Sequence, residues 1–234
     1  MAILAPQAQY RTKQAMVYDR LREAILKGEL GAGTRLIIND LAEQLNVSPS
    51  PVREAIQQLH AEGLVSLIPH VGAVVTSVSP DEVREIFALL ESLEVIGSRV
   101  AAERLTPDDL QRLRAILAEM NTALSDGDSS LWTDLNREFH LEVCRIADMA
   151  LLTEFTAKVL DRWQRVRHAF IPNAPLGYIR ETQAEHEAIV DAMAARDFDC
   201  LESLTREHNR KAMARYGSAL QPNRSLRLPE HAPR

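Results

Sequence analysis

Three histidines in the second half of the chain have the residue type and spacing to bind a metal ion: His140, His186 and His208. His186 follows Ile179 by seven residues on one helical stripe, and His208 follows Leu201 in the same way, so both are expected to face a core. A buried imidazole is costly unless it is hydrogen-bonded or bound to metal. Each histidine alone fits a hydrogen-bonded core residue. Three that converge from different helices fit a metal site, and spacing leaves both interpretations open.

Neighbouring residues support convergence of the three histidines. Asn136 precedes His140 by one helical turn, so the two side chains share a helix face. His186 and His208 lie at similar distances from the break at Arg196-Asp197. An antiparallel pair of helices would therefore bring these two rings level.

The elements that must position these residues are helices. Ser79 can cap a helix with Pro80 at its first position, and Thr106-Pro107 repeats this start signal. No convincing strand appears after residue 79, so we predict an all-α bundle of six or seven helices over residues 79–219. Six are expected at about 80–104, 107–126, 129–148, 150–170, 177–195 and 198–218.

A second functional stretch, residues 41–59, predicts two short helices joined by a tight turn. Asn46 suits a helix C-terminus. Ser48 or Ser50 can cap the next helix, and Pro51 is tolerated in its first turn. This arrangement is typical of a helix-turn-helix, whose second helix enters the DNA major groove, although an ordinary helical hairpin shows the same signals.

The segment after this pair favours DNA binding. Residues 62–68 and 73–78 are β-prone runs separated by a short turn that contains Gly72, which predicts a hairpin. A helix at 10–27 precedes the pair, so residues 10–78 have the element order of a winged helix-turn-helix. The whole chain is predicted to be mainly α, with flexible termini at residues 1–9 and 220–234.

Composition narrows the function classes. The 234-residue chain carries a net charge of −6. Its two cysteines offer no disulfide framework, which favours a reducing cytoplasm. No apolar run approaches the roughly 20 residues that span a membrane. Residues 1–79 hold seven basic and seven acidic side chains, so all the net negative charge lies in the bundle. DNA affinity must then come from a few placed side chains and from two copies acting together.

The first domain resembles the GntR family of bacterial transcription regulators. The resemblance lies in LREAILKGELGAGTRL at residues 21–36, LAE at 41–43, PVREA at 51–55 and EGL at 62–64. It implies a homodimeric regulator, with repression the expected sense, that reads a double-stranded operator. The implied DNA-binding residues are Arg35, Asn39, Ser48, Pro49, Ser50, Arg53, His70 and Gly72. Pro49 stands where relatives commonly have an arginine that reads bases, which predicts an unusual operator or weaker binding.

The bundle is similar to the FCD effector domain of the FadR-type branch of this family. NREFH at residues 136–140, the pair Glu185-His186 and the later His208 carry the likeness. It implies a divalent metal held by His140, His186 and His208, with Asn136 at a place where aspartate is commoner. Three imidazoles favour zinc or nickel over magnesium or calcium.

The same resemblance implies that the bundle senses a small carboxylic acid. The family's usual arginine in the first bundle helix is missing, because Leu90 occupies its place, so the charge partner of a carboxylate is unassigned. A metal-dependent hydrolase is a second interpretation, since catalytic zinc also uses three histidines. The adjacent acids Glu138 and Glu185 are expected to point away from the site, so we predict no enzyme. A third is a structural dimerisation bundle without effector.

Overall fold

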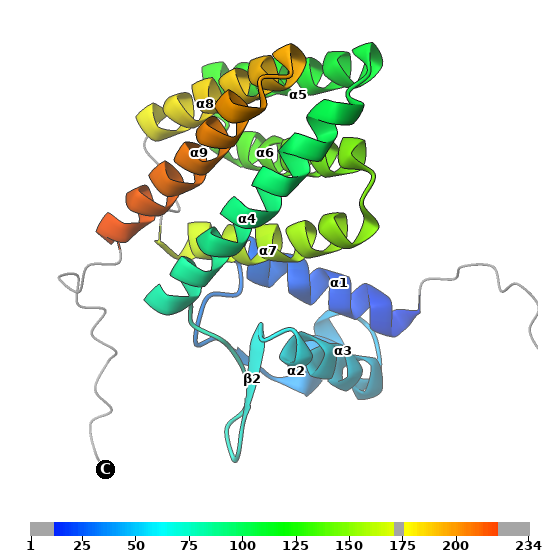
Figure 1. Ribbon diagram of the computed structural model, residues 1–234. Helices are drawn as coiled ribbons and strands as arrows, with labels where there is room; N and C mark the ends of the chain where they lie inside the picture. The colour runs from blue at the N-terminus through cyan, green and yellow to red at the C-terminus, as the bar shows by residue number, and fades with distance from the viewer. Residues whose placement is uncertain (1–11, 171–175, 220–234) are drawn as a thin grey trace, which may run out of the picture. The chain divides into compact units, whose positions relative to one another are not determined.

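The computed structural model describes residues 12–170 and 176–219, and the chain divides into two compact units, Met1–Val78 and Ser79–Arg234 (Figure 1). The segments expected to be flexible, residues 1–9 and 220–234, lie outside the described residues. No helix in the described ranges is long and apolar enough to cross a membrane.

The first unit is a winged helix, as the sequence predicts. Its elements are α1 (Lys13–Leu26), β1 (Arg35–Leu36), α2 (Ile38–Gln44), α3 (Pro49–Ala61), β2 (Val65–Ile68) and β3 (Gly72–Val75). α1 and α3 face each other across a core that includes Val17, Leu21, Val52, Ile56 and Leu59. The left-handed backbone of Asn46, with φ of 52°, turns the chain between α2 and α3.

Strand β1 was not expected from the sequence. It pairs antiparallel with β3, placing Leu36 opposite Ala73, and β3 pairs with β2, so the sheet order is β1-β3-β2. The sequence predicts no element between the helix at residues 10–27 and the helix pair at 41–59. Two residues are too few to show the alternation of a strand, and β1 exists because of its tertiary pairing.

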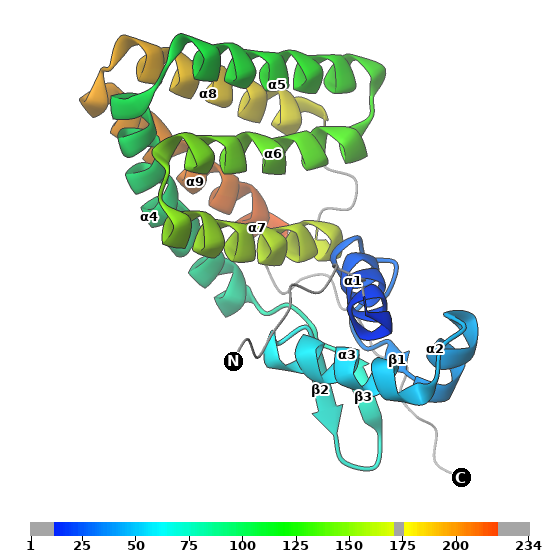
Figure 2. The same cartoon turned by 90° about the vertical axis from the view of Figure 1, so that its right-hand side faces the viewer.

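The second unit is the predicted all-α bundle. Its described helices are α4 (Pro80–Arg104), α5 (Pro107–Asp126), α6 (Ser129–Ala147), α7 (Ala150–Phe170), α8 (Leu176–Ala195) and α9 (Phe198–Ala219). Figure 2 shows α5, α6 and α7 as successive layers, with α8 beside α5. In Figure 1, α4 and α9 cross in front of these layers, and α4 packs on α6, α7 and α9. Side chains facing the middle of the bundle therefore come from several helices at once.

The start of α5 is fixed by a capping box that also ties α5 to α6. Thr106 Oγ1 accepts a hydrogen bond from Asp109 N, and the Asp109 carboxylate accepts from Thr106 N. Asp109 also pairs with Arg112 and, at 2.6 Å, with Arg145 of α6. Hydrogen bonds from Thr106 and Arg145 hold the pKa of Asp109 well below its usual value, although burial opposes this.

Substitution of Asp109 tests this junction. Asp109→Ala removes the cap and leaves the arginines without their shared carboxylate, so we expect about 1–2 kcal/mol of lost stability. Asp108→Ala is the matched control, because Asp108 is an exposed acid in the same first turn. Chemical denaturation should give a loss at least twice as large for Asp109→Ala. Equal losses would show that the capping box does not hold the junction.

Candidate metal centre and DNA interface

Three histidine side chains meet inside the bundle, one each from α6, α8 and α9. His140, His186 and His208 are buried, and one ligand nitrogen from each lies within 4.8 Å of the others. The ring centroids of His186 and His208 are 4.8 Å apart, and His140 lies 5.2 Å from His186 and 5.8 Å from His208. The fold thus brings together the three residues that helical spacing singles out.

Carboxylates behind the cluster hold two of the rings. Glu94 Oε1 lies 3.1 Å from His140 Nδ1, and Glu185 Oε2 lies 2.8 Å from His208 Nδ1. With each Nδ1 engaged, Nε2 is the nitrogen left to face the cluster. Metal-ligating histidines commonly use this arrangement, because the carboxylate fixes the tautomer and ring orientation and raises the basicity of the ligand.

The sequence predicts that Glu185 points away from the site, but the structure shows that its carboxylate contacts His208. Residues adjacent on a helix diverge by about 100°, so Glu185 does not follow His186 into the cluster. Its side chain instead reaches α9 and contacts the outer edge of His208. Glu138 is exposed, as expected.

His186 is the most constrained member of the cluster. It is fully buried, and neither ring nitrogen has a hydrogen-bond partner among the residues that the structure describes. Phe139 packs at 4.6 Å between ring centroids, and Trp132 stacks at 6.3 Å. Burial holds the pKa of His186 well below its usual value, with His208 and His140 adding to the effect, so the ring is in the neutral form that binds metals.

The donor set fits a divalent transition metal. Zinc binds imidazole nitrogen at about 2.0–2.1 Å, which puts ligands of a tetrahedral site about 3.4 Å apart. Nitrogens within 4.8 Å of one another reach that spacing by small side-chain shifts. Asn136, buried one turn before His140, can add an amide oxygen. The cluster therefore fits a metal better than a hydrogen-bonded core.

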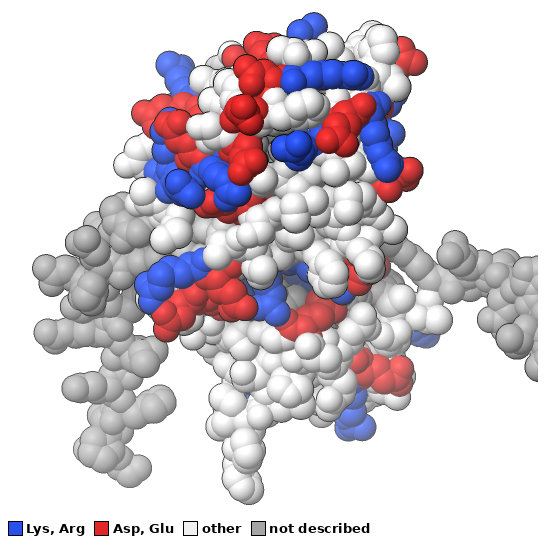
Figure 3. All heavy atoms as spheres, viewed as in Figure 1, with Lys and Arg blue, Asp and Glu red and all other residues white. Residues whose placement is uncertain are grey.

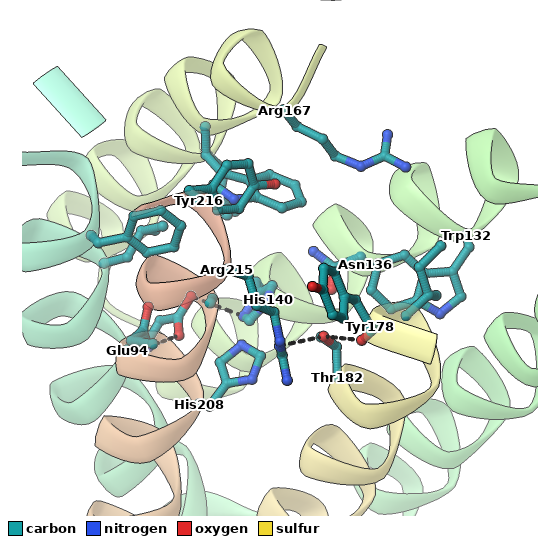
Figure 4. Close-up of a pocket in the computed structure, with 17 residues that line it drawn as sticks. Glu94, Trp132, Asn136, His140, Arg167, Tyr178, Thr182, His208, Arg215 and Tyr216 are labelled. Atoms are coloured by element: carbon teal, nitrogen blue, oxygen red, sulfur yellow. Dashed lines mark hydrogen bonds and ion pairs between the residues drawn. The ribbon is translucent and has the colours of Figure 1, made fainter. Parts of the chain in front are cut away.

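A cavity of about 660 Å³, counting the space at its open mouth, adjoins the histidines (Figure 4). His140, His208 and Asn136 line one part of it. Its walls are largely aromatic, being formed by Phe87, Trp132, Trp163, Tyr178 and Tyr216. Leu90, at the place where relatives carry an arginine, is buried in this wall and supplies no charge.

Two arginines that the sequence analysis missed also line the cavity, Arg167 of α7 and Arg215 of α9. Arg215 lies seven residues after His208, so helical spacing could have placed it on the same face. Arg167 carried no such signal. It belongs to a helix that offers no metal ligand, and only tertiary packing places it at the cavity.

Glu185 links Arg215 to the histidine cluster. Its Oε1 accepts from Arg215 Nη2 at 3.1 Å, while its Oε2 contacts His208 Nδ1. Burial alone would raise the pKa of Glu185, but the hydrogen bond with His208 and the charge of Arg215 outweigh it, and the pKa lies below the usual value. The carboxylate is thus ionised and able to orient His208.

Each predicted DNA-binding residue lies on the surface of the first unit. Arg35, Asn39, Ser48, Pro49, Ser50, Arg53, His70 and Gly72 are all exposed. Ser48 occupies the N-cap position of α3, but its side chain makes no capping hydrogen bond. The expected alternative cap, Ser50, lies inside the helix, where its hydroxyl donates to Glu54 at 3.1 Å. The Ser48 hydroxyl therefore does not cap the helix by a hydrogen bond.

The wing has unusual chemistry for a DNA contact. The hairpin from Val65 to Val75 contains no charged residue, and it is white in Figure 3. Positive φ angles at His70 (64°) and Gly72 (102°) form its tip. Arg35 lies opposite Val74 at the wing base, and its Nε lies 3.9 Å from the position that a Cβ on Gly72 would take. Arg35 and Arg53 are the two arginines among the residues predicted to contact DNA.

Comparisons with known proteins identify the family. Residues 13–75 match the bacterial regulatory proteins of the gntR family, and residues 85–211 match the FCD domain. The second match spans more than half of the chain. The chain therefore belongs to the GntR family of DNA-binding transcription regulators, and it carries an FCD domain. It is a regulator and not an enzyme.

Individual relatives agree. The HTH-type transcriptional regulator McbR of Escherichia coli K12 is 30% identical over 181 residues, covering 77% of this chain and 82% of the relative. The HTH-type transcriptional repressor RspR of the same organism is 27% identical over 194 residues, covering 82% and 83%. The solved structure of E. coli McbR/YncC superposes with a TM-score of 0.77 at 27% identity, covering 88% of this chain and 98% of that one.

Removing the Glu185 carboxylate should weaken metal binding. Glu185→Gln leaves His208 without an ionised partner, and loss of such partners typically costs 10–100-fold in metal affinity. Competition with a chelator of known zinc affinity measures the change. Glu181→Gln is the matched control, because Glu181 lies one turn away, pairs with the same Arg215 and does not contact a histidine. The same affinity in both variants would contradict the role assigned to Glu185.

Proposed function

We propose that this protein is a cytoplasmic, metal-containing repressor that releases its operator when a small carboxylate binds in the bundle cavity. The metal, zinc or nickel, is held by His140, His186 and His208, with the amide of Asn136 as a further ligand. The observation that carries the proposal is His186, whose two buried ring nitrogens have no hydrogen-bond partner among the described residues. A ring in that position is stabilised most directly by coordination to a metal.

When bound, the metal supplies a positive centre with an open position for a carboxylate oxygen. The chain's own residues do the rest. Glu94 and Glu185 hold the outer nitrogens of His140 and His208, so the rings keep one orientation. The aromatic side chains reduce the contact of the cavity with water, which strengthens charge–charge contacts beside them. Since Asn136 brings no negative charge, the site retains more positive charge for the ligand than an aspartate would leave.

The DNA-binding assembly is proposed to be a homodimer. The reading unit has no net charge, so one copy has little non-specific affinity for DNA, and two linked copies gain through effective concentration. Two winged helices would read half-sites one helical turn apart. In each copy the proposed contacts come from the start of α2, the N-terminal turns of α3, the wing tip and the wing base: Asn39; Ser48, Pro49, Ser50 and Arg53; His70 and Gly72; and Arg35.

Repression is supported by the name of the relative RspR, a transcriptional repressor. In such a regulator the effector changes how the two reading units approach DNA. Coupling between separate sites is typically about 1–3 kcal/mol, which corresponds to a change of about 5–150-fold in affinity.

Metal removal and reloading test the sensor. Full-length protein is stripped with a chelator, reloaded with zinc or nickel, and titrated onto an operator selected from random duplexes, with and without a panel of small carboxylic acids. We expect one metal per chain and at least fivefold weaker operator binding with a matching acid. His140→Gln with His208→Gln should abolish both effects. Metal content and DNA release that survive the double substitution would favour a purely structural bundle.

The first residue of α3 gives a separate test of the DNA interface. Pro49 is exposed at the start of this helix and has no donor for a base edge. Pro49→Arg should add a preference for guanine at one position of each half-site, worth about 1–3 kcal/mol. Pro49→Ala controls for the loss of the proline ring. Selection from random duplexes reads the outcome, and an identical base profile for both variants would place position 49 away from the base edges.

A further inference from the structure

Arg167 is a buried cation without a carboxylate partner in the part of the chain that the structure describes. Its side chain lines the cavity, and the residue is 4% exposed. Its Nη2 donates to Ser129 O at 3.3 Å, and that carbonyl already accepts from Thr133 Oγ1 at 2.7 Å. No carboxylate among the described residues lies within ion-pair distance of it. Tyr216 and Asp134 are the groups that favour its charged form.

Two other arginines of the bundle, the buried Arg165 and the half-buried Arg215, have carboxylate partners. Arg165, one turn along from Asp161 on the same helix, donates to Glu82 at 2.6 Å. Arg215 pairs with Glu181 and Glu185, each at 3.1 Å. Burial lowers the pKa of Arg167, which reflects the cost of holding its charge there. A buried charge is normally paired, and the open space beside Arg167 is the cavity itself.

We propose that Arg167 binds a second anionic group of the effector, so that the ligand class is a small dicarboxylate. One carboxylate binds at the metal, as in the proposed function on which this inference rests, and the other pairs with the guanidinium of Arg167. Figure 4 shows Arg167 and His208 on opposite sides of the cavity, with Tyr178 and Tyr216 between them in the view. A carbon linker between the carboxylates would contact these rings.

The chemistry of the two ends explains the choice of ligand. A planar guanidinium can donate two parallel hydrogen bonds to one carboxylate, and such charge-assisted pairs are strong where water is excluded. A monocarboxylate at the metal would leave Arg167 unpaired. A dicarboxylate satisfies both ends and brings the missing negative charge into the cavity. Arg167, which lies on α7, would thereby bind the anion that Leu90, at the expected position on α4, cannot bind.

Calorimetric titration of the zinc-loaded full-length protein tests the inference. The probes are unbranched dicarboxylates from succinate to pimelate, each beside the monocarboxylate with the same number of carbon atoms. We expect at least one dicarboxylate to bind tenfold or more tightly than its partner acid. Arg167→Gln should bring that ratio close to one. Arg180→Gln, which removes the same charge from an exposed site on α8, should leave it unchanged.

The outcomes separate this inference from the proposed function. Zinc content is measured in the same samples, and a chain that retains no zinc contradicts both. If zinc is retained but every dicarboxylate binds no better than its partner acid, the inference is overturned and the metal site stands. A preference that survives in Arg167→Gln overturns it too. If Arg167→Gln does not fold, Arg167→Lys is measured in its place. The affinity ratio of dicarboxylate to monocarboxylate in the wild-type protein still tests the inference.

Discussion

The second unit depends on one constraint, the burial of an imidazole that has no hydrogen-bond partner within residues 12–170 and 176–219. His186 lies between Phe139 and Trp132, with His140 and His208 across from it, and all three rings come from different helices. Glu94 and Glu185 satisfy the outer edges of two rings, while the inner nitrogens remain. A protein core tolerates such a cluster when a cation shares it. A metal at the point where side chains of α6, α8 and α9 meet, as proposed above, would stabilise these buried rings.

Charged side chains are used differently in the reading unit and in the bundle. The reading unit is neutral and its wing uncharged, so the proposed DNA contacts depend on a few side chains at the start of α3 and at the wing base. In the bundle, by contrast, two arginines line the cavity. Arg215 is paired with protein carboxylates, whereas Arg167 has no carboxylate partner among the described residues. The proposed ligand would pair with Arg167 and place its other charged end at the proposed metal.

Much of the fold follows from local sequence signals. Ser79-Pro80 and Thr106-Pro107 start helices where predicted, and periodicity placed the histidines on inward faces. Features that depend on tertiary packing could not be predicted from the sequence. Strand β1 is too short to show alternation, and Glu185 contacts His208 only because α8 and α9 pack together. Arg167 gave no signal at all, since an arginine in an amphipathic helix usually faces solvent. The roles of Asn136 and of the DNA-contacting residues remain predictions.

The most direct test of the central claim is X-ray absorption at the zinc edge of the stripped and reloaded full-length protein. The account predicts one bound zinc per chain whose shell contains three imidazole rings at about 2.0–2.1 Å, with oxygen completing the coordination. It also predicts no sulfur, because Cys144 packs in the apolar core and Cys200 is exposed. Failure to retain zinc, or a shell that contains sulfur or lacks the imidazole scattering, would contradict it.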